Sequence, residues 1–362
     1  MANDDPANPP RQRRGRGAAS NLAGRFVPQV SARESDGWQT DVEPLERLLT
    51  EAIEEKAKSI IASNQSPDLP FSQSINPYRG CEHGCIYCYA RPAHAYMDLS
   101  PGLDFESRIF FKPNAAALLD KALRKRSYQC SPIALGSNTD PYQPLEKDKQ
   151  ITRQLLETMQ RFNQPVTIVT KGQLILRDLP LLAEMAQDNL AQVAISVTTL
   201  DNELKRRLEP RTAGPAARLR ALEQLSHVGI PTAVMAAPMI PALNDSELER
   251  ILRAARDAGA RHAAYILLRL PFEVAPLFRQ WLAEHYPERA SHVMSLVQQS
   301  RGGRDYQSDF SQRQTGIGVF AQLLQQRFRV AINKLGLNRR KLKLDCNRFQ
   351  PPPRAGDQQS LF

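Results

Sequence analysis

The sequence has few cysteines, no long apolar run and no apolar signal core at its N-terminus. Only 5 of the 362 residues are Cys. That small, odd number excludes a disulfide-rich scaffold and favours free thiols or metal ligands. No apolar stretch approaches the ~20 residues of a membrane span. The start, Met1 to Pro6, lacks the apolar core of a secretory signal, so we expect a cytoplasmic protein. The composition also excludes a collagen-like or wholly disordered chain.

Positive charge is in surplus. There are 48 Lys and Arg against 38 Asp and Glu, a formal net charge of +10. Basic clusters occur at residues 11–16, 124–126, 205–207 and 339–343. Such clusters suit neutralisation of phosphate groups, which makes DNA or RNA a candidate partner. The alternative is that they are solvated helix faces, and both interpretations stay open from the sequence.

The first part of the chain is predicted to contain little packed structure. Residues 1–41 should form a largely disordered basic arm, because they lack apolar periodicity. Such an arm is either a solubilising tail or a weak binder of polyanions. Residues 42–69 are predicted to be a helical lead-in, since Leu45, Leu48 and Ile53 recur at mostly helical spacing.

Short apolar runs then alternate with helical patterns. The runs lie at 131–137, 166–171, 193–198, 232–240 and 263–270, with residues 76–80 as a first strand and 108–112 as an extra one outside the main sheet. Between them, helices are expected at 152–162, 174–187, 216–227 and 245–258. This alternation indicates an α/β core with a parallel sheet over residues 70–286. Six such units form either a partial barrel or an open doubly wound sheet. A helical extension should follow over 287–337, with helices at 290–299 and 319–335, and then a basic, Pro-rich tail over 338–362.

Polar residues end several of the predicted strands. Asn138 and Asp140 follow the run at 131–137, and three later runs finish in polar residues, among them Lys171, Ser196 and Arg269. Ligands of parallel α/β proteins bind at the carboxyl ends of the strands. Polar loops are common in any protein, so it is their repetition that predicts a ligand site at this edge.

Three cysteines form the most specific motif, with the spacing C-x3-C-x2-C at Cys81, Cys85 and Cys88. Thiolates this close in a loop are suited to an iron–sulfur cluster or zinc. A 4Fe–4S cluster held by three cysteines keeps one iron open for a ligand. Gly80 and Gly84 allow the tight curvature of such a loop. Two alternatives remain: a zinc site completed by a residue such as His83, and an electron-transfer cluster whose fourth ligand is one of the isolated cysteines, Cys130 or Cys346.

The motif, with its aromatic residue before the last cysteine, resembles the radical S-adenosylmethionine superfamily. The wider segments 74–96, 136–146, 209–211 and 268–271 resemble a bacterial subgroup described as DNA repair photolyase-like and related to spore photoproduct lyase. The resemblance implies an α/β fold with a partial (β/α)6 TIM-type barrel. It also implies that the three cysteines hold a 4Fe–4S cluster with S-adenosylmethionine at the open iron, and that cleavage of this cofactor yields a 5′-deoxyadenosyl radical.

The same resemblance implies which residues hold S-adenosylmethionine. Oxygen atoms after the second strand should face its methionyl ammonium group, an aromatic ring its nucleoside, and basic or hydroxyl groups its carboxylate or ribose. The residues are Tyr87, Ser137, Asn138, Asp140, Lys171, Ser196, Arg211 and Arg218. An electron donor such as flavodoxin or ferredoxin is the expected partner.

The chain departs from spore photoproduct lyase at one position. That enzyme carries a hydrogen-donating cysteine just before the serine after its second strand, where this chain has Gly136. The predicted function is therefore a radical enzyme acting on nucleic acid, for lesion repair or modification, with the reaction unassigned. The alternatives are a protein or small-molecule substrate, or a non-catalytic, metal-stabilised nucleic-acid-binding module.

The C-terminal residues resemble the pentapeptide by which bacterial replication and repair proteins bind the sliding clamp. The expected anchors are Gln358, Leu361 and Phe362. The alternative is that the terminal apolar pair folds back onto the domain.

Overall fold

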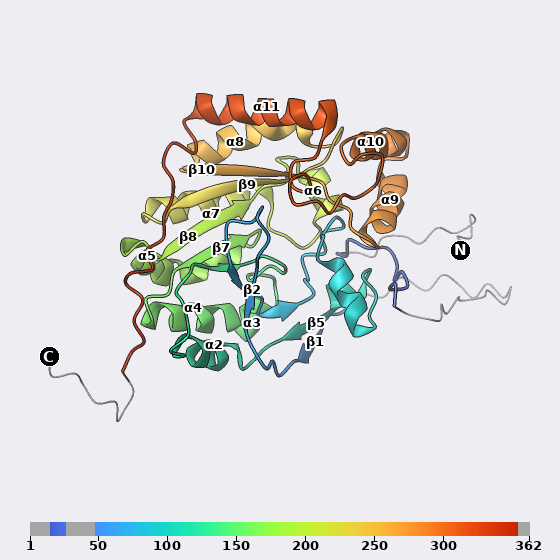
Figure 1. Cartoon of the computed structure of the whole chain (residues 1–362). Helices are drawn as coiled ribbons and strands as arrows, with labels where there is room; N and C mark the ends of the chain where they lie inside the picture. Colours follow the sequence, from blue (N-terminus) through green and yellow to red (C-terminus); the bar gives the residue numbers. More distant parts are fainter. Residues whose placement is uncertain (1–14, 27–47, 354–362) are drawn as a thin grey trace.

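A curved seven-stranded sheet forms the centre of the protein in the computed structural model, which describes residues 15–26 and 48–353 (Figure 1). Its strands, in spatial order, are β10 (His262–Leu267), β9 (Thr232–Met239), β8 (Ala191–Ser196), β7 (Val166–Thr170), β6 (Ile133–Leu135), β3 (Gln73–Ile75) and β2 (Ile61–Ser63). All neighbouring pairs are parallel except β2 and β3, which form an antiparallel hairpin at one edge.

The strand order selects between the two architectures that the sequence left open. From β3 to β10 the parallel strands follow one another in chain order. Right-handed crossovers that always step in the same direction put every helix on the same face of the sheet. A doubly wound sheet would reverse its order instead. The fold is therefore a partial barrel, open between the edge strands β2 and β10.

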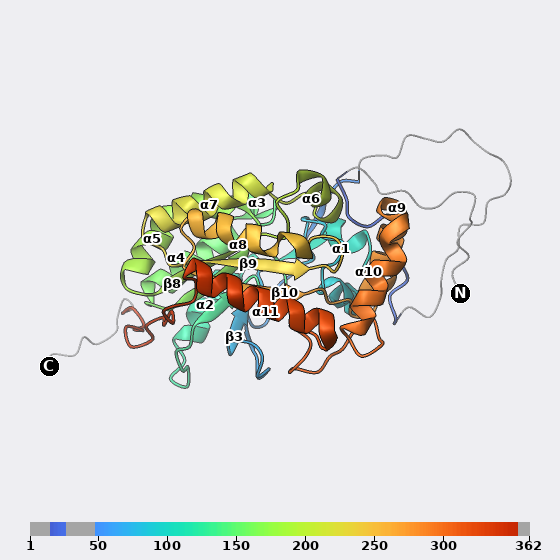
Figure 2. The same cartoon turned by 90° about the horizontal axis from the view of Figure 1, so that it is seen from above.

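Helices cover the outer face of this sheet (Figures 1 and 2). They are α2 (Ala115–Leu123), α4 (Ile151–Arg161), η2 (Gln173–Asp178), α5 (Leu179–Gln187), α7 (Pro215–His227), η3 (Asp245–Glu247) and α8 (Leu248–Asp257), with α11 (Gly318–Leu335) lying over α8. Near the carboxyl ends of the strands lie η1 (Arg91–Met97), α1 (Asp104–Ser107), α3 (Glu146–Lys149), α6 (Asn202–Leu208), α9 (Val274–His285) and α10 (Pro287–Gln299). The predicted helices of the core and of the C-terminal extension are thus present.

The two faces of the sheet differ in how closely they are packed. In β9, Val234 and Ala236 are fully buried, whereas the alternate residues Met235 and Ala237 are only half-buried and line a cavity. Successive strand residues point to opposite faces, so the first pair belongs to the helix-covered side. The concave side of the barrel is therefore left partly unfilled, and the cavity lies there.

Two expectations about the N-terminal part were wrong. No helix occupies the described residues between 48 and 69: β1 (Glu51–Glu54) and β2 are strands. β1 pairs with β5 (Arg108–Phe111) in a second, three-stranded sheet, and Leu49 is 75% exposed, so the apolar spacing there does not reflect packing of a helix face. Isolated helices are marginal in water, and strand pairing supplied by a distant segment outweighs them.

The first strand of the barrel also begins earlier than predicted. It is β3, whereas β4 (Tyr78–Arg79) pairs with β5 in the small sheet. Pro77 lies between the two strands and has no N–H to donate to a ladder, which explains why the chain changes sheets there. The short strand expected over 108–112 does lie outside the main sheet.

A loop after α10 joins the two edges of the open barrel. Leu267 N in β10 donates to Gln314 O over 2.9 Å, while Arg313 binds the carboxylate of Asp68, in the β2–β3 hairpin loop, through Nε and Nη2 at 2.6 Å each. The segment 300–317 thus crosses the open side of the barrel.

Several predictions concern residues outside the described ranges. These are the basic positions up to residue 14, residues 27–47, and the proposed clamp-binding anchors Gln358, Leu361 and Phe362. Within the arm, residues 15–26 have a defined place, because Gly17 N and Ala18 N each donate to the Glu106 carboxylate at 2.8 Å; the expectation of disorder was wrong for them. None of the helices in the described ranges is long and apolar enough to cross a membrane.

Candidate active site

The three motif cysteines lie on one loop between β4 and η1 and line one cavity. Cys81 and Cys85 are buried and Cys88 is half-buried. The loop turns as the sequence predicts, with φ of +80° at Gly80 and +66° at Gly84. A Cβ at Gly84 would lie 2.7 Å from Glu106 Oε2, so glycine is required there for space as well as for backbone conformation.

A buried ion pair between Arg91 and Glu106 holds the cysteine loop in place. Arg91 donates to Cys85 O at 3.0 Å and to Glu106 Oε1 at 2.5 Å, and both charged side chains are inaccessible to solvent. Glu106 also accepts the two main-chain N–H groups of the N-terminal segment. The N-terminal segment, the loop and α1 are thereby joined through one carboxylate.

The thiols are in surroundings that oppose a free thiolate. Burial, followed by the charge of Asp140, raises the pKa of Cys81 well above its usual value. Burial, followed by the charge of Glu209, raises the pKa of Cys85 to about 12. Thiolates buried together in this way require a cationic partner, and a cluster iron is one. The donor set therefore fits an iron–sulfur cluster.

The alternative metal sites fit less well. Among the described residues, no three His, Cys, Asp or Glu side chains converge on the position of a single ion, as zinc requires. Ligands of a cluster each bind a different iron and need not be so close. His83, considered as a zinc ligand, instead directs Nδ1 at Asp140 Oδ2, 3.3 Å away. Cys130 and Cys346 do not line the cavity, so neither lies where a fourth cluster ligand would be needed.

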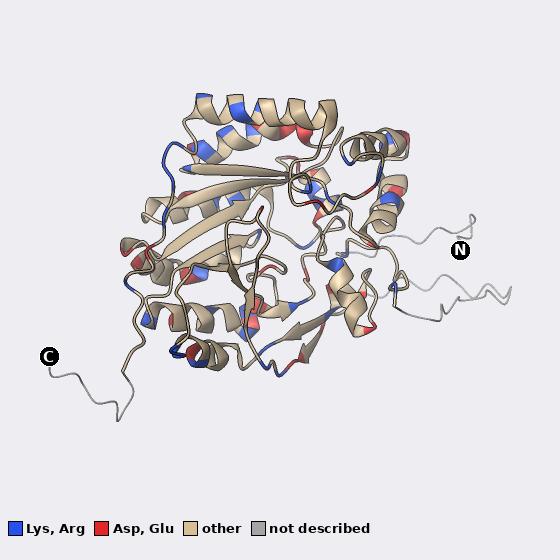
Figure 3. Cartoon of the chain, in the orientation of Figure 1, with Lys and Arg blue, Asp and Glu red and all other residues tan. Residues whose placement is uncertain are grey.

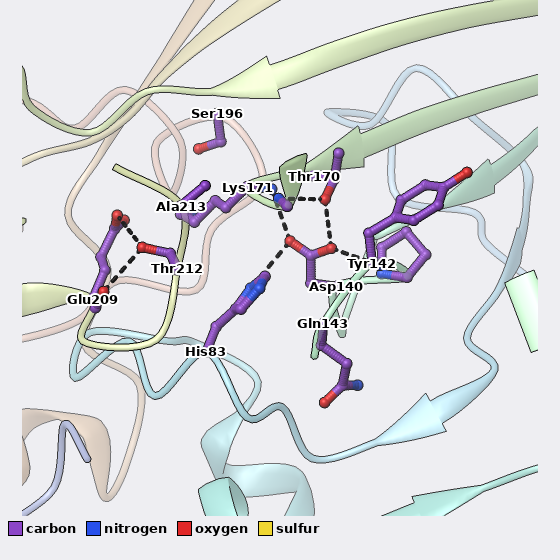
Figure 4. A network of polar contacts seen from close by, with 12 residues as sticks. His83, Asp140, Tyr142, Gln143, Thr170, Lys171, Ser196, Glu209, Thr212 and Ala213 are labelled. Carbon is purple, nitrogen blue, oxygen red and sulfur yellow. Dashed lines mark hydrogen bonds and ion pairs between the residues drawn. The ribbon is translucent and has the colours of Figure 1, made fainter. Parts of the chain in front are cut away.

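Asp140 is the centre of a hydrogen-bond network in the cavity wall (Figure 4). Besides facing His83, its carboxylate accepts from Thr170 Oγ1 at 2.6 Å, Lys171 N at 2.8 Å and Tyr142 N at 2.9 Å. Burial opposes its ionisation, but the charge and hydrogen bond of His83 and the other donors lower its pKa to about 2. The carboxylate is therefore satisfied by protein donors and holds the ends of β6 and β7 together.

The remaining predicted residues of the β6 and β7 ends are divided between the cavity and its surroundings. Asn138 is exposed at the cavity wall and donates its main-chain N–H to Asn76 at 3.1 Å. Ser137 contacts Asn76 through its hydroxyl, and its carbonyl accepts from the Tyr89 hydroxyl. Lys171 lines the cavity, with Nζ 5.9 Å from the centre of the Tyr87 ring.

Tyr87 and Ser196 also line the cavity. The Tyr87 hydroxyl is bound to Glu209 and lies 3.3 Å from Thr198 Oγ1, which leaves its ring as the surface offered to a ligand. Ser196 donates to Ala237 O at 3.2 Å. Figure 4 shows Ser196, Lys171 and Asp140 arranged around the same space, as the strand-end argument predicts.

The two predicted arginines lie elsewhere. Arg218 is buried, forms an ion pair with buried Glu209 and donates to Ser196 O at 2.9 Å. Burial opposes ionisation of Glu209, but the guanidinium of Arg218 holds its pKa down at about 2. Arg211 binds Glu82 at 3.0 Å. Neither arginine is in the cavity wall, because each is held by a carboxylate beneath it.

Sequence reasoning missed several residues of this site. Tyr89 follows the last cysteine directly and lines the cavity; its position beside the motif was the available signal. Glu209 was noted only as part of a motif, and Glu106 carries no sequence signal, since nothing local distinguishes a carboxylate that will be buried.

The backbone explains the departure at Gly136. This residue has φ of +85°, and a Cβ there would lie 2.0 Å from Val169 O of the neighbouring strand. A cysteine at position 136 would therefore require the main chain to move. Cys130 does not replace such a cysteine, because it precedes β6 and lies at the amino end of the sheet.

The fold and the site together are an open parallel barrel with a three-cysteine loop at its carboxyl edge. This combination is typical of one enzyme class, and comparison with known families identifies it. The family model of the radical SAM superfamily matches residues 75–255, half of the 362-residue chain. The chain belongs to the radical SAM superfamily, and this membership supports a radical SAM enzyme with an iron–sulfur cluster and S-adenosylmethionine.

Relatives extend the similarity without assigning a reaction. An uncharacterized protein of Mycobacterium tuberculosis is 40% identical over 240 residues, covering 65% of this chain and 71% of the relative. One of Methanocaldococcus jannaschii is 28% identical over 238 residues, covering 66% and 85%. A mutant of spore photoproduct lyase matches in fold, with a TM-score of 0.53, 14% identity, and coverage of 79% of this chain and 80% of that one. Another mutant of that enzyme, solved with bound AdoMet and dinucleoside spore photoproduct, gives a TM-score of 0.51 at 15% identity, with the same coverage.

Proposed function

We propose that this protein is a 4Fe–4S radical S-adenosylmethionine enzyme that abstracts hydrogen from nucleic acid, in repair or modification. The observation that carries the proposal is the placement of three thiols of one loop in the same cavity wall as the polar ends of β6, β7 and β8. When bound, the cluster and S-adenosylmethionine supply a reducing electron and a 5′-deoxyadenosyl radical.

The residues of the chain would divide the work of binding. Cys81, Cys85 and Cys88 would hold the cluster. Asn138, Lys171 and Ser196 would hold S-adenosylmethionine through polar groups that face the cavity. Asp140 orients His83 and the main chain of Lys171, so its effect on the cofactor is one of positioning.

Nucleic acid is favoured as the substrate by charge. The chain has a net charge of +10, and many of its Lys and Arg residues lie on the outer helices and on the segment after α11, interspersed with Asp and Glu (Figure 3). A neighbour in fold is solved with AdoMet and dinucleoside spore photoproduct together. The lyase reaction itself is not proposed, since Gly136 leaves no room for a cysteine beside the second strand.

The test is anaerobic reconstitution with iron and sulfide, followed by reduction in the presence of S-adenosylmethionine. We expect a brown protein with about four irons per chain that forms 5′-deoxyadenosine. Cys85→Ala should lose both properties, whereas the matched variant Cys130→Ala, at the other end of the sheet, should retain them. Colourless protein after reconstitution, zinc in place of iron, or full turnover by Cys85→Ala would contradict the proposal.

The substrate class is tested separately with deuterium-labelled DNA. Deuterium should appear in 5′-deoxyadenosine when labelled DNA is present. Transfer from labelled protein and not from DNA would assign the other substrate class and leave the radical chemistry intact.

A further inference from the structure

Arg269 is a cation in the cavity wall, and the proposed binding of the cofactor gives it no role. It follows β10, and its guanidinium carbon lies 5.0 Å from the centre of the Tyr89 ring and 5.9 Å from that of Tyr306. Tyr89 belongs to the cysteine loop and Tyr306 to the segment that crosses the open side of the barrel. The arginine therefore joins the cofactor end of the cavity to the open side.

The charge of Arg269 has no counter-ion among residues 15–26 and 48–353. No described carboxylate oxygen lies within ion-pair distance of its guanidinium. Its Nη1 and Nη2 reach Gln314 Oε1 and Tyr306 OH only at 3.5 Å each, and its buried Nε has no hydrogen-bond partner within the described part of the chain. A partly buried guanidinium with unfilled donors is costly unless an anion binds it.

A second arginine adds to the positive potential. Arg301 is 1% exposed and donates to the carbonyls of Leu267 and Leu268, directly before Arg269, at 3.0 and 2.7 Å. Burial, and next the charge of Arg269, lower the pKa of Arg301 to about 10. Arg301 thus fixes the main chain directly before Arg269. Because Arg301 is itself a cation, it does not neutralise the charge of Arg269.

The chemistry of this position selects its ligand. A planar guanidinium forms paired hydrogen bonds to phosphate oxygens, and the neighbouring tyrosine rings provide faces for stacking of bases. A cavity at the end of a barrel suits a single strand or an extruded nucleotide better than an intact duplex. We propose that Arg269 is a substrate-positioning residue that binds a phosphodiester group of a nucleic-acid strand whose target nucleotide enters the cavity. This inference rests on the proposed nucleic-acid substrate.

The experiment is fluorescence anisotropy of a fluorescein-labelled oligothymidylate with the full chain, over about 50 to 200 mM salt. Arg269→Gln should weaken binding at least about tenfold, since a charge-assisted hydrogen bond is lost. It should also reduce the slope of log affinity against log salt by about 0.7, the value for one phosphate contact on a single strand. A merely structural role would not change that slope.

Three companion variants keep the test decisive. Arg269→Lys retains the charge without the planar fork and should give an intermediate loss of affinity. Tyr306→Leu should weaken binding through lost stacking and leave the salt slope unchanged. Arg256→Gln, an exposed arginine at the end of α8 paired with Asp257, should change neither quantity. Thermal denaturation of each variant verifies that it is folded.

The contradictory outcomes are distinguishable. If the unaltered chain binds the oligonucleotide and Arg269→Gln binds it with the same affinity and slope, the inference is overturned and the proposed substrate stands. An equal loss in Arg256→Gln would also overturn it, because binding would then follow total charge. No oligonucleotide binding by the unaltered chain would overturn both the inference and the nucleic-acid substrate.

Discussion

The two ends of the parallel sheet carry the five cysteines of the chain in different surroundings. At the carboxyl end, Cys81, Cys85 and Cys88 share a glycine-turned loop in the wall of the cavity. At the amino end, Cys130 lies 3.6 Å from Gln164 Oε1 and close to Cys346, and both of these cysteines are half-buried. The same type of side chain thus lines the cavity at one end of the sheet and lies away from it at the other.

The ends are also held together by different forces. At the carboxyl end, buried ion pairs dominate, Arg91 with Glu106 and Arg218 with Glu209. At the amino end, residues 338–353 form a C-terminal strap that passes along the sheet, visible at the left of Figure 1. Phe349 of the strap stacks near Phe162, with ring centres 6.4 Å apart. Breaking a buried ion pair costs about 3–5 kcal/mol, whereas an aromatic pair contributes about 0.5–1.5 kcal/mol beyond burial. The site end should therefore tolerate substitution less well.

The largest expected difference is between two carboxylates. Glu106→Gln should lower the free energy of unfolding by about 3–5 kcal/mol, because it leaves Arg91 buried without a counter-ion. The matched change at the amino end is Asp188→Asn, which breaks the exposed ion pair with Arg348 and should cost at most about 1 kcal/mol. Urea denaturation of both variants measures the difference. Equal costs would show that the two ends do not differ in this respect.

The next prediction concerns pH. Burial lowers the pKa of His94, beneath the cysteine loop, from 6.5 to about 4. The pKa of His94 is lower in the folded state than in the unfolded one. The contribution of the neutral ring to the free energy of unfolding is therefore fully present above pH 6.5 and is lost as the pH falls toward 4. From about pH 7.5 to 5 this loss should reach roughly 2 kcal/mol.

The control for this pH effect is a pair of variants. His94→Gln should remove most of the dependence, measured as the free energy of unfolding at both pH values. His262→Gln, at the amino end, should remove less, since His262 is half-buried and its pKa is also lowered by burial, but without a large shift. A pH dependence that survives in His94→Gln would assign it to other groups.

The smallest expected effect is on the strap. Phe349→Ala should reduce the free energy of unfolding by about 1–2 kcal/mol, since a half-buried ring is removed from its contacts with Tyr128 and Phe162. Iron content after reconstitution should be unchanged, because the strap lies at the end of the sheet opposite to the cysteine loop. Loss of iron in this variant would mean that the two ends are coupled.

Much of the fold was predictable because its signals are local. The apolar runs and helical patterns identified five of the six parallel barrel strands and the outer helices from α4 onward, whereas α2 was not predicted and the first strand, β3, lies a few residues before its predicted position. The lead-in helix was wrong because β1 obtains its hydrogen-bond partners from β5, more than fifty residues later in the chain. Periodicity within one segment cannot report such a partner.

The site was predictable in part for the same reason. Asn138, Lys171 and Ser196 line the cavity because parallel strands end at a common edge. Arg211 and Arg218 do not, because each is held by a carboxylate that only folding brings to it, Glu82 and Glu209. From the sequence alone, a basic residue in a motif can either line the cavity or be paired with a carboxylate outside it.

The sequence by itself determined the three-thiol loop, since the spacing of Cys81, Cys85 and Cys88 is set by covalent geometry and the two glycines permit its turns. The tertiary structure decided which charges are free. It satisfied Asp140 with donors from three places in the chain and buried Arg218 against Glu209. It left Arg269 between two tyrosine rings, without a counter-ion among the residues that the structure describes. The physical reason is that the cost of a charge depends on its burial and its partners, and both are properties of contacts between residues distant in the chain.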